Sequence, residues 1–282
     1  MTLTVFLAVI LAAALHATWN ALVKGGADKH LNMAGVVLGH APLATIVLLV
    51  EPIPEPESWP YLLAGVLLHF GYQMFLLTSY RFGDLTQVYP IARGSAPLLV
   101  AAISVLFLGV VLSSLEIIAV VIIGAGIVSL GLVRSESGAR NGKAALLALT
   151  TGCFIASYSL VDGLGARLSG TPVGYYAWLG MANAAIFALY LGITKPGLLP
   201  KVTREGRVTF WIGGSASFIA YGLVMWAFTQ APIALVTALR ETSIIFALAI
   251  GILFLKEKID VPKVFSTFTT LLGAILLRFS KG

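Results

Sequence analysis

The sequence has little charge for its length. Of its 282 residues only 11% are Asp, Glu, Lys or Arg, whereas 59% are hydrophobic and the mean hydropathy is +0.96. Soluble domains carry roughly 25% charged residues, so this composition excludes an ordinary soluble protein. Apolar runs of about 20 residues, the length that crosses a bilayer, follow one another with short connections between them. One integral membrane domain is therefore predicted to fill the chain.

Motifs for catalysis and cofactor binding are also missing. The single cysteine, Cys153, excludes an internal disulfide, and no spacing of His, Asp and Glu suits a metal ion. Neither the G-x-S-x-G motif of hydrolases nor the G-x-x-x-x-G-K-[ST] loop of ATP-binding proteins occurs. We therefore expect no metal, no cofactor and no enzymatic activity.

The formal net charge of +6 does not indicate a nucleic-acid partner. The basic residues lie in short loops between hydrophobic runs and form no patch interleaved with aromatic residues. Membrane topology explains them better, as shown below.

The fold class predicted is an all-α membrane protein with ten transmembrane helices. The predicted spans are residues 3–23, 31–50, 59–80, 85–108, 115–133, 144–163, 171–193, 208–229, 232–255 and 260–279. The first span is not a signal peptide, because no basic residue precedes it and no small-residue cleavage site follows it.

Residues in the second half of the chain repeat those of the first. Arg93 and Arg240 are 147 positions apart, as are Gly126 and Gly273, and Tyr72 and Tyr221 are separated by 149. In the first and sixth spans ATWNALVK aligns with ASYSLVDG. The matches occur in the same order along the chain. They predict two five-helix repeats, residues 1–135 and 136–282, that together form one transmembrane domain.

Each repeat holds an odd number of spans, so the second must cross the bilayer in the opposite direction to the first. The loop charges agree with this, because thirteen basic residues fall on one face and only Arg167, Arg278 and Lys281 on the other. By the positive-inside rule the first face is cytoplasmic. We expect a multi-pass protein of the inner (cytoplasmic) membrane with both termini outside, where the acidic stretch EPIPEPES also lies.

The stretch LFLGVVLSSLEIIAVVIIGAGI is repeated as LFLKEKIDVPKVFSTFTTLLGAI. With ten spans in two inverted halves, this pattern resembles the EamA branch of the drug/metabolite transporter (DMT) superfamily, although the first half lacks the glutamate of the family's FLGE. The resemblance implies alternating-access transport of small metabolites, often amino acids or related solutes, without ATP. The chain also resembles EamA-type permeases encoded beside phosphonate-utilisation genes, which would make an aminoalkylphosphonate a candidate solute.

Arg93 lies in the middle of an apolar span, where an arginine costs at least about 2.5 kcal/mol on insertion scales. Such residues face a bundle interior or a wet cavity. Pro90 and Pro97 each remove a backbone hydrogen bond, so a break in this helix is predicted at both prolines. Broken helices at the interface of inverted repeats commonly line substrate sites. The alternative is that Arg93 and Arg240 only tie helices together or reach a lipid headgroup.

Glu241 follows Arg240 directly and has two possible roles. It either pairs with Arg93 across the repeat interface as a structural ion pair, or acts as a carboxylate that can be neutralised for proton coupling. Counting Arg93, Arg240 and Glu241, the deep charge is +1, which favours a solute with at least one anionic group.

Aromatic and polar side chains accompany these charges on the neighbouring spans. Tyr72 and Tyr221, and Trp19 and Tyr158, are repeat mates that could stack on an organic solute, although aromatic residues also form interfacial belts. His16 is either a hydrogen-bonded bundle residue or a second proton-coupling candidate, whereas His40 and His69 are interpreted as structural. The predicted substrate-binding set comprises Arg93, Arg240, Glu241, Tyr72, Tyr221, Trp19, Asn20, Tyr89, Gln73 and Tyr158.

The function predicted is secondary active transport of a small polar, anionic or zwitterionic, amino-acid-like metabolite, with protons as one energy source. The expected partners are that solute, the lipid bilayer and protons, and a monomer suffices because one chain supplies both halves. The alternative is a non-transporting membrane scaffold or assembly protein with a packed interior. A membrane-embedded enzyme ranks third, because no pair of nucleophile and base is present.

Overall fold

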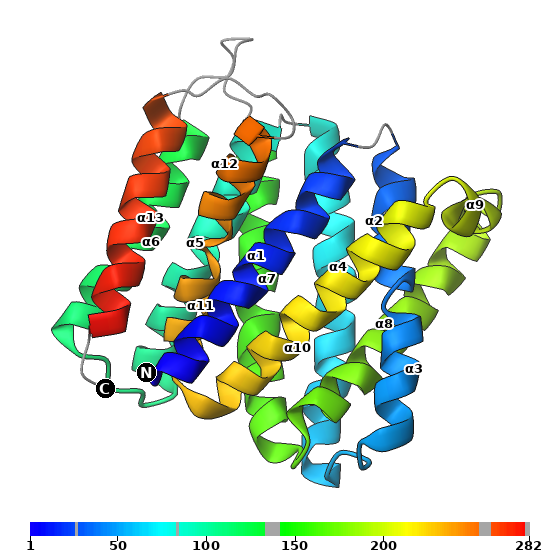
Figure 1. The fold of residues 1–282 in the computed structure, drawn as a ribbon, viewed down its shortest axis with the longest axis horizontal. Helices are drawn as coiled ribbons and strands as arrows, with labels where there is room; N and C mark the ends of the chain where they lie inside the picture. Colours follow the sequence, from blue (N-terminus) through cyan, green and yellow to red (C-terminus); the bar gives the residue numbers. More distant parts are fainter. Residues whose placement is uncertain (26–27, 83–84, 133–141, 254–260, 280–282) are drawn as a thin grey trace.

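The structure is a computed structural model that describes residues 1–25, 28–82, 85–132, 142–253 and 261–279. Throughout these residues the only regular secondary structure is helix (Figure 1). The helices of the first half are α1 (Leu3–Gly25), α2 (Lys29–Leu38), α3 (Ala41–Val50), the short 3-10 helix η1 (Pro56–Ser58), α4 (Trp59–Phe82), α5 (Leu85–Phe107) and α6 (Ser114–Leu132).

The second half is also helical throughout its described residues. Its helices are α7 (Gly142–Leu168), α8 (Pro172–Thr194), the short α9 (Leu199–Arg204), the π-helical turn η2 (Thr209–Gly213), α10 (Gly214–Gln230), α11 (Ile233–Arg240), α12 (Ser243–Leu253) and α13 (Val261–Phe279). Each of the ten ranges predicted as a span contains one of these helices or two in succession. The helix α9 was not predicted.

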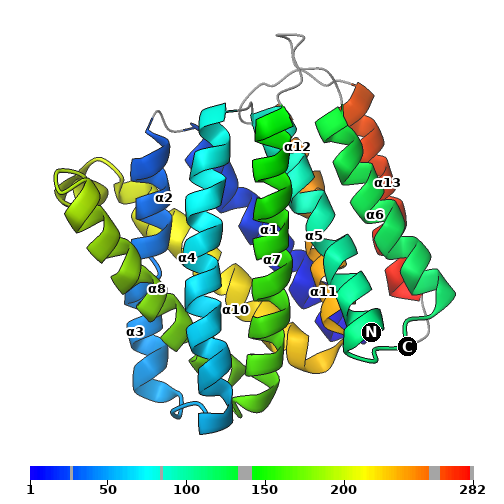
Figure 2. The same ribbon diagram turned by 180° about the vertical axis from the view of Figure 1, so that it is seen from behind.

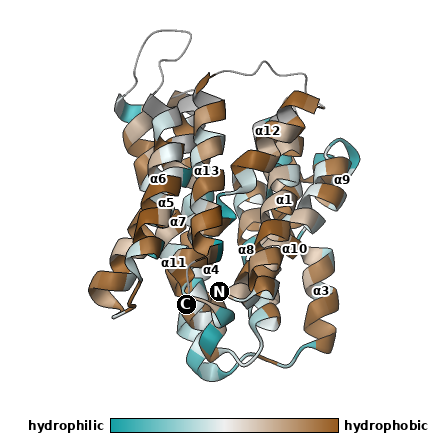
Figure 3. Ribbon diagram, turned by 60° about the vertical axis from the view of Figure 1, so that its left-hand side comes forward, coloured by the Kyte–Doolittle hydropathy of each residue, from teal (hydrophilic) through white to brown (hydrophobic). Residues whose placement is uncertain are grey.

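Seven segments are long and apolar enough to cross a membrane: Leu3–Val23, His30–Val50, Pro56–Ser79, Gly142–Leu168, Pro172–Thr194, Thr209–Gln230 and Ile233–Ile250. Three further apolar helices are shorter: Ile91–Phe107, Ser114–Ser129 and Val264–Phe279. Hydrophobic residues occupy most of the length of the long helices (Figure 3). The all-helical membrane architecture is confirmed, and the count of ten spans in two sets of five stays a prediction.

The helices form two facing layers. One layer contains α1, α10 and α12, and the other contains α4, α5, α6 and α7 (Figures 1 and 2). Within the first layer α1 packs against α10 and α12, and within the second α7 packs against α4 and α5. Across the layers α10 packs against α7. The pair α6 and α13 closes one edge of the bundle, and α2, α3 and α8 close the other. The start of α1 and the end of α13 lie at the same end of the bundle (Figure 1).

Glycines let α2 approach the start of α10 closely. A Cβ on Gly35 would collide with the hydroxyl of Thr209, and one on Gly39 would collide with the carbonyl oxygen of Phe210. From the other side, a Cβ on Gly214 would lie 2.5 Å from the Cα of Gly39. Small residues such as these allow helix backbones to touch in a membrane.

The described helices are interrupted in a different span from the one predicted. The helix α5 runs without interruption from Leu85 to Phe107, so the break expected at Pro90 and Pro97 is wrong. Each proline removes one backbone hydrogen bond only, and packing of α5 against α6 and α7 supports the remaining turns. The interruption is instead in the ninth predicted span, where α11 ends at Arg240 and α12 begins at Ser243.

Candidate functional site

A buried ion pair joins α5 to the junction between α11 and α12. The Nε of Arg93 donates to Oε2 of Glu241 at 3.0 Å, and Nη2 of the same guanidinium lies 2.9 Å from Oε1. Both residues are almost completely buried, with 4% and 2% of their surface exposed. The first of these contacts is a charge-assisted hydrogen bond, which is stronger than one between neutral groups, and the second adds a close contact between the opposite charges. Of the two roles predicted for Glu241, the structure contains the ion pair across the bundle.

Arg240 shares the same carboxylate at longer range. Its Nε lies 4.0 Å from Oε1 of Glu241, and its guanidinium carbon lies 5.8 Å from the ring centroid of Tyr221. Only 2% of Arg240 is exposed, and its Nε and Nη2 have no hydrogen-bond partner among the described residues. A buried charge without hydrogen bonds is costly. Arg240 therefore retains the capacity to bind an acidic group.

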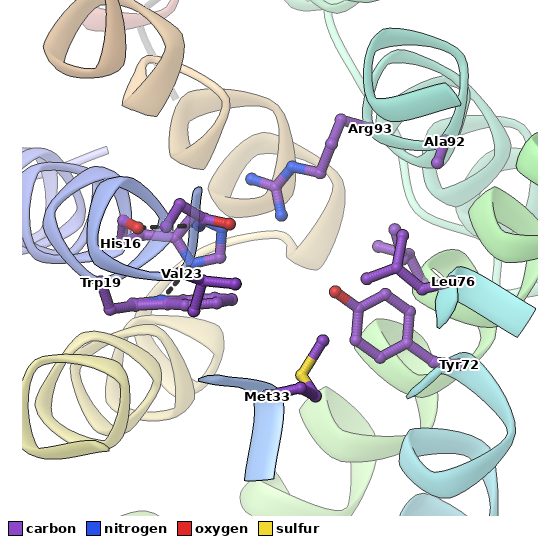
Figure 4. Close-up of a pocket in the computed structure, with 10 residues that line it drawn as sticks. His16, Trp19, Val23, Met33, Tyr72, Leu76, Ala92 and Arg93 are labelled. Carbon is purple, nitrogen blue, oxygen red and sulfur yellow. Dashed lines mark hydrogen bonds between the residues drawn. The ribbon is translucent and has the colours of Figure 1, made fainter. Parts of the chain in front are cut away.

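Two adjoining cavities lie beside these charges. The larger has a volume of about 80 Å³ and the smaller about 40 Å³, and His16, Trp19, Met33 and Tyr72 line both. Figure 4 shows the smaller one, into which Arg93 extends from α5 opposite His16 and Trp19 of α1 and Tyr72 of α4. Such volumes hold several water molecules where polar groups are present to bind them.

The cavities bring together residues that the sequence predicted for one site. Those on the larger cavity are His16, Trp19, Tyr72, Gln73, Tyr158, Tyr221 and Arg240, and the smaller one adds Asn20 and Arg93. Glu241 reaches the site through its pairing with Arg93. The side chains of Tyr89 and Pro90 lie outside the described residues.

The sequence interpretation missed a buried carboxylate. Asp162 on α7 has no exposed surface, and its Oδ2 lies 2.8 Å from Nε2 of His69 and accepts a 2.7 Å hydrogen bond from the hydroxyl of Tyr221. His69 and Tyr221 both line the larger cavity. His69 therefore forms part of the cavity wall and not only of the packing between helices. The deep charge of +1 needs correction, because two carboxylates now accompany the two arginines.

The imidazole of His69 is enclosed by tyrosines. Its ring stacks on Tyr158 with centroids 4.1 Å apart and an interplanar angle of 23°, and it meets Tyr221 edge-on at 5.5 Å. Tyr158 also meets Tyr72 edge-on at 5.6 Å. The predicted repeat mates Tyr72 and Tyr221 thus both contact Tyr158.

His16 is held in a local hydrogen-bond network on α1. The indole Nε1 of Trp19 donates to Nδ1 of His16 at 3.2 Å, and the amide Nδ2 of Asn20 donates to the carbonyl oxygen of His16 at 2.8 Å. The structure thus contains the hydrogen-bonded form of His16, which was one of its two predicted roles. Within the described part of the chain, no cluster of three His, Cys, Asp or Glu side chains could hold a metal ion.

Comparison with known proteins gives the family of the chain. The sequence model of the EamA-like transporter family matches residues 3–132 and 142–279, which is most of the chain in two segments. Among solved structures, 29 chains match, including one crystal structure that is 18% identical in sequence, covers 98% of each chain and has a TM-score of 0.74. That structure shows the fold alone. A search among curated proteins gave no match.

Proposed function

Because the chain belongs to the EamA-like transporter family, we propose that it is a secondary active transporter that moves a small zwitterionic or anionic, amino-acid-like metabolite by alternating access. The family is one of membrane transporters within the DMT superfamily and not of enzymes.

The observation that carries this proposal is the set of unpartnered polar atoms on the wall of the larger cavity. Arg240 offers two N–H groups, and the carbonyl oxygens Oε1 of Gln73 and Oδ1 of Asn183 offer acceptors, none with a hydrogen-bond partner among the described residues. Buried polar atoms without partners are rare in folded proteins and need an explanation. A solute with an acidic group for the guanidinium and an ammonium group for the amide oxygens would satisfy both kinds of atom.

The charges around the cavity favour the same class of solute. Glu241 occupies Arg93, so Arg240 is the arginine with donors left for an external anion. Tyr221 lies between Arg240, which faces its ring, and Asp162, which accepts from its hydroxyl. Positive and negative side chains thus flank one aromatic ring. A zwitterionic amino acid matches this polarity, as does an aminoalkylphosphonate.

Alternating access by two inverted halves is supported by the packing of the helices. By the proposed repeat, α1 corresponds to α7, α4 to α10 and α5 to α12. The contact of α1 with α10 then has its equivalent in that of α7 with α4, and the contact of α5 with α7 has its equivalent in that of α12 with α1. The pairs α6 with α13 and α3 with α8 exchange onto themselves. The two segments matched by the family model fall within the proposed repeats. These regularities support rocking of residues 1–135 against 136–282 around the central site.

We also place the protein in the cytoplasmic membrane with both termini outside. The start of α1 and the end of α13 lie at one end of the bundle, and η1, with its acidic neighbours, is at the same end (Figure 1). The basic helix α9 belongs to the loop that the positive-inside rule assigns to the cytoplasm.

Flux into proteoliposomes tests the proposal. A ¹⁴C-labelled mixture of amino acids, and separately 2-aminoethylphosphonate, are offered to vesicles that contain the full chain. We expect uptake, and we expect Arg240→Gln to reduce it by tenfold or more, because hydrogen bonds to a charged group contribute about 1.5–3 kcal/mol. The matched control is Arg204→Gln on the exposed face of α9, which should not change the flux. Equal flux in Arg240→Gln and the control would refute the site.

The alternative function, a non-transporting scaffold, predicts a different result for solute flux and for the stability of Arg240→Gln. A packed assembly protein has no need of a buried guanidinium with unused donors beside a cavity. If none of the offered solutes moves, and if Arg240→Gln destabilises the fold as strongly as the loss of Glu241, the polar residues connect helices only. That result would favour the scaffold over the transporter.

A further inference from the structure

We infer that Asp162 and His69 form the proton-binding site of this transporter, and that a proton bound there moves in the same direction as the solute. The inference rests on the proposed function and assigns its coupling ion and coupling residues. Neither residue is among the proton-coupling candidates predicted from the sequence, which were Glu241 and His16. The geometry of the pair, its burial and its position behind the cavity wall support it.

Asp162 is deeply buried and only partly compensated. Its Oδ2 accepts from the hydroxyl of Tyr221 and faces Nε2 of His69, whereas Oδ1 points at the backbone of Gly65 and has no donor among the described residues. An ionised carboxylate in such surroundings carries a desolvation penalty that two hydrogen bonds do not remove. One added proton, on Nδ1 of His69 or on the carboxylate itself, brings the net charge of the pair to zero.

The position of His69 gives this proton a route to the cavity. Its ring lines the larger cavity, while Asp162 lies behind it. With Nε2 turned toward Asp162, the second ring nitrogen, Nδ1, remains to exchange a proton. Imidazole side chains serve as proton carriers because one ring nitrogen can release a proton while the other keeps its hydrogen bond.

Several titratable or charged groups surround the pair. Tyr158 of α7 and Tyr221 of α10 contact His69, and Tyr176 of α8 contacts Tyr221. Arg240 of α11, His16 of α1 and His40 between α2 and α3 line the same cavity as His69, and the hydroxyl of Tyr175 of α8 lies beside Gly165 of α7. Arg240 is the permanently charged member of this set, and it sits over the ring of the same tyrosine that donates to Asp162.

The candidates predicted from the sequence are less suited to this role. Protonation of Glu241 would take the counterion from Arg93, which holds both of its oxygens, and would leave two buried guanidinium groups without a carboxylate. Nδ1 of His16 already accepts from the indole of Trp19. The Asp162–His69 pair can take up a proton without breaking an arginine–carboxylate pair.

The shared tyrosine couples the proton to the solute. A negative charge on Asp162 opposes the binding of an acidic group at Arg240, and a proton on the pair removes that opposition. Because coupling between two binding equilibria is reciprocal, a bound acidic solute also favours the protonated pair. Solute and proton therefore bind together and cross together.

Two experiments test the inference, one of them independent of any solute. Infrared difference spectra of the full chain in lipid, recorded between alkaline and acidic buffer, should show imidazole or carboxyl bands of proton uptake that vanish in both His69→Gln and Asp162→Asn. Tyr221→Phe, which removes a donor but no titrating partner, should keep these bands, as should Glu241→Gln. Bands that persist in both His69→Gln and Asp162→Asn, or that vanish only in Glu241→Gln, would overturn the assignment.

The second experiment compares two fluxes of the labelled amino-acid mixture in proteoliposomes. One is accumulation driven by an imposed pH gradient, and the other is exchange without a gradient. In His69→Gln we expect the ratio of driven accumulation to exchange to fall by about tenfold, the scale of a typical coupling free energy. An unchanged ratio in both His69→Gln and Asp162→Asn would refute coupling through this pair. Absence of exchange in the unmodified chain would refute the proposed function for these solutes, and the infrared result would still decide the proton site.

Discussion

Arg93 and Arg240 share one carboxylate, that of Glu241, and substitutions of Glu241 and of Arg240 should affect the free energy of unfolding differently. Glu241 lies 3.0 and 2.9 Å from the Arg93 nitrogens but 4.0 Å from the nearest Arg240 nitrogen. Replacing Glu241 by Gln leaves two buried guanidinium groups beside an uncharged amide. Removing one partner of a buried ion pair typically costs about 3–5 kcal/mol, so we expect Glu241→Gln to lower the free energy of unfolding by that amount.

Arg240→Gln should behave differently because it removes the cation that has no hydrogen bond. The substitution loses an attraction at 4.0 Å to Glu241, and it also removes repulsion from Arg93 and the burial of unused donors. An unsatisfied buried polar group costs about 1–3 kcal/mol, which offsets the lost attraction. We expect the free energy of unfolding to change by less than about 1 kcal/mol while solute binding is lost.

Unfolding by SDS in mixed micelles, followed by circular dichroism, measures both free energies. Glu205→Gln is the matched control, because Glu205 forms an exposed pair with Lys201 at 3.8 Å, and such pairs contribute about 1 kcal/mol or less. If Arg240→Gln proves as destabilising as Glu241→Gln, Arg240 is a structural residue and the reasoning about its free donors fails.

Two further predictions concern packing and topology. Gly39→Ala should lower the free energy of unfolding by about 1–3 kcal/mol, because its Cβ would meet the backbone of Phe210. Gly197→Ala is the control, because nothing lies within 4 Å of the new carbon. Equal stability of the two variants would contradict the close contact. In a Cys153→Ala background, a membrane-impermeant maleimide added to intact cells should label Glu57→Cys beside α4 and spare Glu205→Cys after α9. The opposite labelling would reverse the orientation that we propose.

The helices could be predicted because each corresponds to a continuous apolar stretch of the sequence. Hydropathy alone placed the ranges of the helices to within a few residues in most spans. The charged residues Arg93, Arg240 and Glu241 were recognised because a charge within an apolar run is rarely accidental. The helix break could not be placed in this way, because proline in α5 gave a local signal that packing overrides, whereas the interruption between Arg240 and Ser243 has no proline or glycine to mark it.

Asp162 was missed for a geometric reason. The sixth span was predicted to end at residue 163, which made Asp162 look like a residue at the end of a helix, where a carboxylate is ordinary. The helix α7 in fact continues to Leu168 and places Asp162 well inside the bundle. Its partner His69 is 93 residues away, on another helix. A contact at that separation follows from how the helices pack and leaves no trace in the spacing of either residue.

Both buried acids at the centre, Asp162 and Glu241, belong to the second half, which makes the two halves unequal. In the alignment of the repeats, the position that matches Glu241 is Gly94, and a Cβ there would already press on the backbone of α6 at Val128 and Gly124. No carboxylate could be accommodated at that place. A dimer made of two copies of the first half would bring two copies of Arg93 together without the carboxylate of Glu241. Within the one polypeptide, a carboxylate from the second half lies beside an arginine of each half.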